Sequence, residues 1–306
     1  MVKAVERAHE IGSDAIQIFS DNPTAWRRRT APPRELPAFR ERLDAYDIAP
    51  VAIHAAYLVN LAGPDPDFWE RSIEILAHEL ETGPAFGARY VNVHIGSHRG
   101  AGVAEGTRRL ADGVARALAA IEDPPETPMV VLENSSGGGF GLGATVEELA
   151  GIAERLDARG IGDEQVGFCL DAAHAWGAGY DLSKADVTDA LLESFDRRIG
   201  IRRLVMIHLN DSKSDLGSRS DRHEHVGAGQ IGEAGMAHLL RHPLLAHATY
   251  FIETPGMDEG YDAINLQRAR DLAAGRTLAP LPPGAMDVKG SRSRTAPGPA
   301  DDELLE

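Results

Sequence analysis

Short apolar runs rich in β-branched residues recur along this chain roughly every 39 residues. The seven runs are centred near residues 17, 52, 91, 130, 168, 206 and 251. Segments with helical spacing lie between them, including 68–83, 105–121, 146–156, 185–195 and 234–241. Alternating strands and helices at this period are typical of a parallel sheet covered by helices, so the sequence predicts an α/β fold.

Two parallel architectures accommodate seven such units: an open, doubly wound sheet and a closed TIM (β/α)8 barrel. The open sheet is disfavoured because no glycine-rich phosphate-binding loop follows any predicted strand. Residues 1–12 have the pattern of an amphipathic helix, so the barrel would lack its first strand at the N-terminus. We therefore predict one TIM-barrel domain over residues 1–275, and we expect a chain that starts at Met1 to leave two strand edges unpaired.

Composition narrows the class of protein. Residues 276–306 are rich in Pro, Gly, Ser, Arg and Asp without apolar periodicity, which predicts a disordered tail. The single cysteine, Cys169, excludes a disulfide framework. The sequence has neither a signal peptide nor a long apolar stretch, which predicts a cytoplasmic protein without a membrane partner. The net charge of −16 opposes binding to nucleic acid unless bound cations supply positive charge at the site.

Six of the seven predicted strands end on a side chain that can bind a metal, and the carboxyl ends of barrel strands all lie on one face. The motifs LDAAHAWGAGYD and SRSDRHEH add three more groups just beyond strands. The nine candidate ligands are His54, His94, Glu133, Asp171, His174, His208, Asp221, His223 and Glu253. One histidine at a strand end is usually structural, but nine convergent imidazoles and carboxylates are hard to explain by packing.

Nitrogen and oxygen ligands without thiolate favour zinc, manganese or iron. At three or four protein ligands per ion, nine groups imply two or three ions with a bridging carboxylate. Glu133 lies in the middle of the ligand series and is the candidate bridge and catalytic residue.

Longer motifs carry a resemblance to a known family. HAAYLVNLA, VNVHIGSH, VLENSSGGG, CLDAAHAWGAGYD, HLNDSKSDLGSRSDRHEHVGAGQIG and FIETPG resemble, in order, the signature blocks of the endonuclease IV family of DNA-repair nucleases. The resemblance extends over residues 16–273. It implies a TIM barrel with three zinc ions, Mn²⁺ being possible in one site. The implied hydrolase is a monomer that cleaves duplex DNA on the 5′ side of abasic sites and leaves a 3′-hydroxyl, in base excision repair.

The same resemblance assigns the ligands to individual ions. The first ion would bind His54 and His94, with Glu133 bridging to the second. The second would also take Asp171, His208 and Glu253. The third would take His174, Asp221 and His223.

DNA contacts are expected in the loops beside these ligands. Tyr57 and Leu58 match a tyrosine–leucine pair with which the family wedges DNA open. The polar loop residues expected to bind flanking phosphates are Asn210, Lys213, Ser218, Arg219 and Arg222. Thr24 departs from the family, because it stands where a basic DNA-contacting residue can occur.

Two other functions stay open at this point. Sugar isomerases and epimerases of the xylose-isomerase-like barrels also place His, Glu and Asp at strand ends, but they need only one or two ions. His174, Asp221 and His223 would have no evident role in such an enzyme. The absent strand and the negative charge suggest the other alternative, an inactive truncated homologue.

Overall fold

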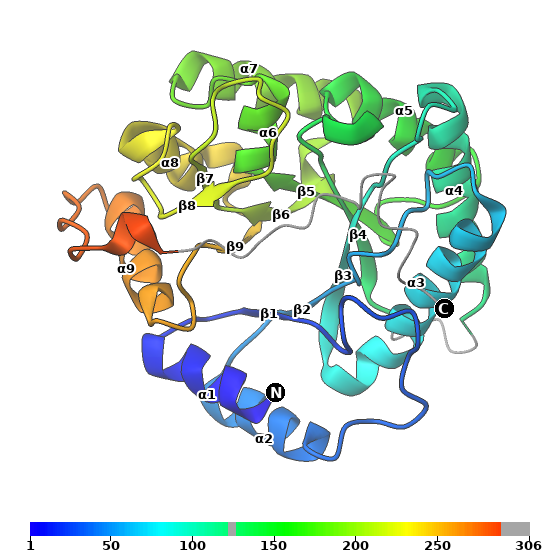
Figure 1. Ribbon diagram of the computed structural model, residues 1–306, viewed down its shortest axis with the longest axis horizontal. Coiled ribbons are helices and arrows are strands. Elements are labelled where there is room, and N and C mark those ends of the chain that lie inside the picture. The colour runs from blue at the N-terminus through cyan, green and yellow to red at the C-terminus, as the bar shows by residue number, and fades with distance from the viewer. Residues whose placement is uncertain (122–126, 289–306) are drawn as a thin grey trace.

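The computed structural model describes residues 1–121 and 127–288. Within them, seven parallel strands form one sheet in the order β1–β2–β3–β4–β5–β6–β9. The sheet curls into a nearly closed barrel with helices around its outside, and β1 and β9 are its two edges (Figure 1). The predicted TIM barrel is confirmed, and the described residues supply seven barrel strands.

The barrel strands are β1 (Ile16–Ile18), β2 (Val51–His54), β3 (Ala88–His94), β4 (Met129–Glu133), β5 (Val166–Asp171), β6 (Leu204–His208) and β9 (Thr249–Phe251). The α-helices are α1 (Val2–Ile11), α2 (Leu36–Tyr46), α3 (Pro66–Phe86), α4 (Val103–Ala119), α5 (Val146–Asp157), α6 (Ala172–Ala178), α7 (Ala185–Arg198), α8 (Gly232–Arg241) and α9 (Tyr261–Ala273). The 3-10 turns are η2 (Gly138–Phe140), η3 (Ile201–Arg203), η4 (Pro243–Leu245) and η5 (Ala285–Asp287). An antiparallel hairpin of β7 (Asp211–Ser212) and β8 (His223–Glu224) lies in the loop after β6. None of the helices in these described residues is both long and apolar enough to cross a bilayer.

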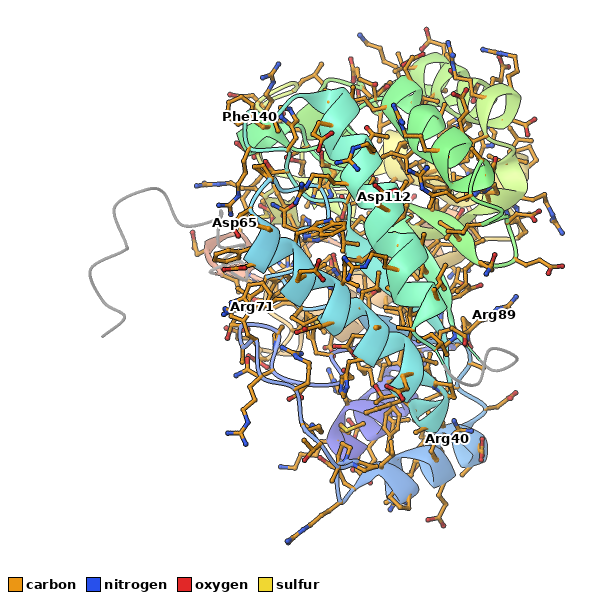
Figure 2. The ribbon with its side chains drawn as sticks, turned by 90° about the vertical axis from the view of Figure 1, so that its right-hand side faces the viewer. Arg40, Asp65, Arg71, Arg89, Asp112 and Phe140 are labelled. Atoms are coloured by element: carbon orange, nitrogen blue, oxygen red, sulfur yellow. The ribbon has the colours of Figure 1, made fainter. Side chains whose placement is uncertain are left out.

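Local capping sets the helix boundaries. The Asp65 side chain accepts hydrogen bonds from the backbone N–H groups of Asp67 and Phe68, and Gly87 ends α3 at a φ of 71°. Figure 2 shows α3 and α4 side by side on the outside of the barrel. Asp65 and Phe140, in the loops after β2 and β4, lie on one side of the molecule, whereas Arg89, at the start of β3, lies on the other (Figure 2). The loops that follow the strands therefore share one face, as a parallel barrel requires.

The strands carry two layers of apolar packing. An outer layer between strands and helices includes the fully buried Ile53, Val91 and Leu132. A separate cluster inside the barrel consists of Ala52, Tyr90, Val131, Cys169, Met206 and Phe251. Side chains on a strand alternate between its two faces, so inner and outer residues follow each other along β2 and β4.

Side chains join the two sheet edges. On the outside, the Arg7 guanidinium of α1 donates to both carboxylate oxygens of Asp262 in α9, at 2.9 and 2.7 Å. On the inside, the Gln17 amide of β1 donates to Glu253, just after β9, at 2.8 Å. These contacts bridge an edge where no backbone ladder between β1 and β9 is formed in the described residues.

The prediction of disorder from residue 276 is wrong for residues 276–288. Leu278 and Ala285 are buried against the barrel. The Arg268 guanidinium donates to the Ala279 carbonyl at 2.8 Å, and the His225 ring donates to the Ala285 carbonyl at 3.0 Å. Single buried apolar residues and these hydrogen bonds hold residues 276–288 in place, although the sequence there has no periodic apolar pattern. Residues 289–306 of the predicted tail lie outside the described residues.

Candidate metal centre

The ligand positions follow from the two-residue alternation of the barrel strands. Each of five predicted ligands stands two residues after an apolar side chain of the inner cluster. The pairs are Ala52 and His54, Val131 and Glu133, Cys169 and Asp171, Met206 and His208, and Phe251 and Glu253. Residues two apart point to the same side of a strand, so a strand that packs the barrel interior also places a polar group above it, at the carboxyl-terminal mouth.

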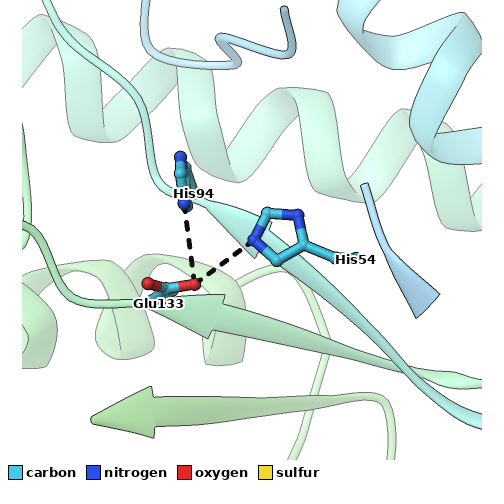
Figure 3. Close-up of side chains that lie close together, drawn as sticks. All are labelled: His54, His94 and Glu133. Atoms are coloured by element: carbon cyan, nitrogen blue, oxygen red, sulfur yellow. Dashed lines mark ion pairs between the residues drawn. The ribbon is translucent and has the colours of Figure 1, made fainter. Parts of the chain in front are cut away.

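His54, His94 and Glu133 form the first group (Figure 3). The Nε2 atoms of His54 and His94 are each 3.7 Å from Oε2 of Glu133. Nδ1 of His54 donates to the Ala55 carbonyl at 2.7 Å, which leaves the lone pair of Nε2 directed into the group. The Asn92 amide donates to the same Glu133 oxygen at 2.6 Å.

Asp171, His208 and Glu253 form the second group. Nε2 of His208 donates to the Gln17 side chain at 3.2 Å, so Nδ1 is the atom free to bind an ion. That Nδ1 lies 3.3 Å from Glu253, 3.8 Å from Asp171 and 3.5 Å from Oε1 of Glu133. Oε2 of Glu133 thus faces the first group, whereas Oε1 faces the second group and also lies 3.2 Å from Nδ1 of His174.

His174, Asp221 and His223 form the third group. Nε2 of His174 is 3.3 Å from Asp221, and Nε2 of His223 is 2.9 Å from the other oxygen of that carboxylate. Backbone carbonyls again hold both Nδ1 atoms: that of Asn134 accepts from His174 at 2.9 Å, and that of Glu253 accepts from His223 at 2.8 Å. All nine predicted ligands therefore converge at the mouth of the barrel.

Bound metal ions explain the positions of these ligand atoms better than hydrogen bonds among the ligand side chains do. His208 Nδ1, Asp221 Oδ1 and His223 Nε2 are buried and make no hydrogen bond, although the last two lie 2.9 Å apart. An imidazole nitrogen and a carboxylate oxygen that face each other at this range repel unless a proton or a metal ion lies between them. The edge of a tetrahedron around zinc, with bonds of about 2.0–2.1 Å, is about 3.3 Å. The separations of 3.3 to 3.8 Å at His208 are close to that value.

Opposite charges stabilise the ionised carboxylates. Burial raises the pKa of Glu133, but the nearby His208 and His94 imidazoles more than offset this and hold that pKa well below its ordinary value. Burial lowers the pKa of His223, whereas Asp221 and Asp171 raise it, and the result is about 9. The carboxylates are therefore ready to act as ligands at neutral pH, and a bound ion would displace protons from imidazoles.

The expected DNA-contacting residues fall into two sets. Tyr57 is 56% exposed, and its ring lies 5.6 Å from that of His54 between centroids. Leu58 beside it is half-buried. Lys213, Ser218, Arg219 and Arg222 are wholly or partly exposed in or beside the β7–β8 hairpin.

Asn210 has a different environment from the one expected. Its side chain is fully buried. Its amide donates to Asp171 at 2.7 Å and to Glu253 at 3.3 Å, and its carbonyl oxygen accepts from the Glu253 backbone at 2.8 Å. The structure therefore favours a role for Asn210 in holding two ligands in place rather than in binding a phosphate.

Three further amides support the ligands and were not predicted. Gln17 contacts Glu253 and His208, Asn92 contacts Glu133, and Asn134 binds the backbone on both sides of Asp171. Two-residue alternation would have found Gln17 and Asn92, because Asn92 stands two residues before His94 and Gln17 lies between the outward-facing Ile16 and Ile18.

Comparison with known proteins identifies the family. The family model of xylose isomerase-like TIM barrels matches residues 5–276. A protein from Methanoculleus marisnigri named "Probable endonuclease 4" is 42% identical over 272 residues, which cover 89% of this chain and 94% of that protein. The chain belongs to the endonuclease IV family. The crystal structure of endonuclease IV from Thermus thermophilus superposes with a TM-score of 0.76 at 37% identity, covering 90% of this chain and 94% of that one.

Membership of this family confirms the predicted fold and the predicted enzyme class, a hydrolase of the endonuclease type. The sugar-enzyme alternative has weaker support. A D-tagatose 3-epimerase-like protein superposes with a TM-score of 0.65 at 17% identity, covering 90% of this chain and 95% of that one. That likeness shows the shared barrel alone.

Proposed function

We propose that this chain is a monomeric endonuclease of base excision repair that hydrolyses the phosphodiester 5′ to abasic sites in duplex DNA and leaves a 3′-hydroxyl. The observation that carries the proposal is the convergence of five imidazoles and four carboxylates in three groups around Glu133. A sugar isomerase needs one or two ions, so it would leave the group of His174, Asp221 and His223 without a role.

Three zinc ions suit the donor set, with Mn²⁺ as an alternative in one site. His54, His94 and Glu133 would hold the first, and Glu133, Asp171, His208 and Glu253 the second. His174, Asp221 and His223 would hold the third. When bound, such ions supply a deprotonated water and neutralise the charge that develops on the phosphate and the leaving oxygen.

The chain's own residues hold this arrangement rigid. Asn92 fixes the Glu133 carboxylate between the first two groups. Asn210 fixes Asp171 and Glu253 relative to each other. Backbone carbonyls fix the rings of three histidines by accepting from Nδ1. Ligands held in this way need little reorganisation when an anionic phosphate arrives.

The exposed side chains around the mouth suit DNA. The Tyr57 ring stands beside His54 and presents an aromatic surface on which a base could stack. An abasic nucleotide lacks stacking and rotates out of a duplex at low cost, so a tight site can select it by shape. The loop that contains Thr24 continues into Arg27 and Arg28, which line a hollow of about 450 Å³ together with Trp26 and Arg71. Arg27 and Arg71 are exposed and supply positive charge beside this loop, whereas the Arg28 side chain is largely buried and paired with Glu79.

The decisive experiment is incubation of zinc-loaded protein with an end-labelled duplex that contains one tetrahydrofuran abasic site. We expect one nick on the 5′ side, a 3′ end that a DNA polymerase extends, loss of cleavage with a chelator, and recovery on addition of zinc. An undamaged duplex of the same sequence should stay intact. Failure of the zinc-loaded protein to nick the abasic strand would refute the proposal.

The Glu133→Gln variant tests the bridge, because the amide keeps the shape but removes the charge that two ions share. We expect it to fold and to lose most cleavage. Glu79→Gln is the matched control, since Glu79 is as buried as Glu133 but contacts Ser20 and Arg28 rather than a metal-ligating histidine. Full turnover in Glu133→Gln, with zinc content unchanged, would show that Glu133 does not bridge.

A further inference from the structure

A second cluster of metal-binding side chains lies on the outside of the barrel, away from the nine ligands. It consists of Asp189 in α7, His238 in the last turn of α8, and His242, the residue that follows α8. One ligand atom from each lies within 4.8 Å of the others. Figure 1 shows α7 and α8 on the outer ring of helices.

The geometry points to a fourth divalent-cation site that joins α7 to α8 and takes a borderline transition metal such as zinc. Nε2 of His238 and Nε2 of His242 lie 2.6 and 3.2 Å from the same oxygen of Asp189. The two rings are 5.4 Å apart between centroids and nearly perpendicular, at 81°. Histidines four residues apart with a carboxylate from a neighbouring helix supply three N/O ligands, which is the usual protein share of a zinc site with open positions.

The surroundings of Asp189 favour a cation. No lysine or arginine in the described part of the chain forms an ion pair with this carboxylate. Among the described residues, its ion pairs are with the two imidazoles. The His242 side chain is only 9% exposed, whereas His238 and Asp189 are 30% and 46% exposed. A bound ion would therefore contact the buried His242 ring on one side and solvent on the other.

Binding has one local cost, which makes the two histidines unequal. Nδ1 of His242 accepts a hydrogen bond of 3.3 Å from the backbone N–H of Leu244. When Nε2 of His242 binds an ion, the ring proton moves to Nδ1 and this long hydrogen bond is lost. His238 has no such competing contact in the described residues, so it is the stronger ligand and the better residue to substitute.

An ion at this site would stabilise a particular part of the barrel. Helix α8 leads through η4 to β9, which is the edge strand beside β6 in the described part of the sheet. An ion shared by α7 and α8 would hold this end of the barrel against the neighbouring unit. Because it binds the folded state alone, stability should increase with the free zinc concentration.

The test uses the untagged full-length protein, loaded with zinc at the barrel centre and dialysed at pH 8. Equilibrium dialysis against micromolar Zn²⁺, with elemental analysis, should show one more ion per chain in wild type than in His238→Ala or Asp189→Asn. Thermal melts should show a melting temperature that rises with Zn²⁺ in wild type beyond any rise in the two variants. His9→Ala, which removes a histidine of α1 stacked on Tyr46, is the matched control and should keep the extra ion.

His242→Asn gives an independent check, because asparagine can still accept from Leu244 but offers no imidazole. It should weaken the extra ion. The inference is overturned if wild type binds no ion beyond those of the centre, or if His238→Ala and Asp189→Asn retain it. Nicking of abasic DNA should be unchanged in these variants, so loss of the outer ion and failure of the proposed nuclease activity give different results.

Discussion

Replacing Asn92 by alanine tests whether the amides beneath the ligands tune the metal centre. The Asn92 amide donates at 2.6 Å to Oε2 of Glu133, both side chains are buried, and the other end of the amide, Oδ1, has no partner in the described residues. The substitution therefore removes one charge-assisted hydrogen bond, which contributes about 1.5–3 kcal/mol. Loss of a partner that orients a metal ligand typically lowers metal affinity about 10- to 100-fold, so zinc affinity at the first two sites should fall by about that factor.

The assay is competition for zinc against a chromophoric chelator, with nicking of abasic duplex measured in parallel at fixed free zinc. Asn265→Ala is the matched control. Asn265 is equally buried, and its side chain forms hydrogen bonds with the backbone of Tyr261 and Val226 rather than with a candidate metal ligand. It should lower the melting temperature and leave zinc affinity unchanged. Wild-type affinity in Asn92→Ala, or an equal loss in Asn265→Ala, would refute the reasoning.

Three further outcomes are expected. Gln17→Ala should reduce zinc retention and lower the melting temperature, because Gln17 contacts Glu253 and His208 across the sheet edges. Elemental analysis after dialysis measures the first effect, and thermal melts measure the second. Tyr57→Ala should weaken binding to abasic duplex without changing zinc content, as fluorescence anisotropy and elemental analysis would show, since the exposed ring is not a ligand. Complete chelation should lower the melting temperature, because it leaves buried carboxylates such as Glu133 without a cation; equal melts with and without chelator would contradict this.

The sequence predicts the strands well because a strand that is buried on both faces consists largely of consecutive apolar residues. In β5, every residue from Val166 to Asp171 is buried, and the same holds for Val51 to His54 in β2. Ligands at strand ends are predictable for the same reason, since the position of the strand fixes where its polar end projects.

Other features depend on tertiary contacts that leave no periodic pattern. The strands of the β7–β8 hairpin are two residues long, which is too short for an alternating pattern of side chains to predict them. The loop position of Asn210 predicts a surface residue, but the β9 edge lies close enough for its amide to contact Glu253. The ordering of Leu278 and Ala285 likewise rests on packing against the barrel rather than on a regular periodic element.

The two edges of the sheet couple the metal centre to the closure of the barrel. In a fully paired barrel, backbone hydrogen bonds would fix the distance between β1 and β9, whereas here Gln17 and Glu253 meet through their side chains. Glu253 is also a ligand candidate, so an ion that positions its carboxylate also positions the Gln17 contact on the opposite edge. Any displacement of β1 relative to β9 changes the geometry at His208, which contacts both residues. Metal binding and closure of the barrel should therefore favour each other, since each fixes groups that the other requires.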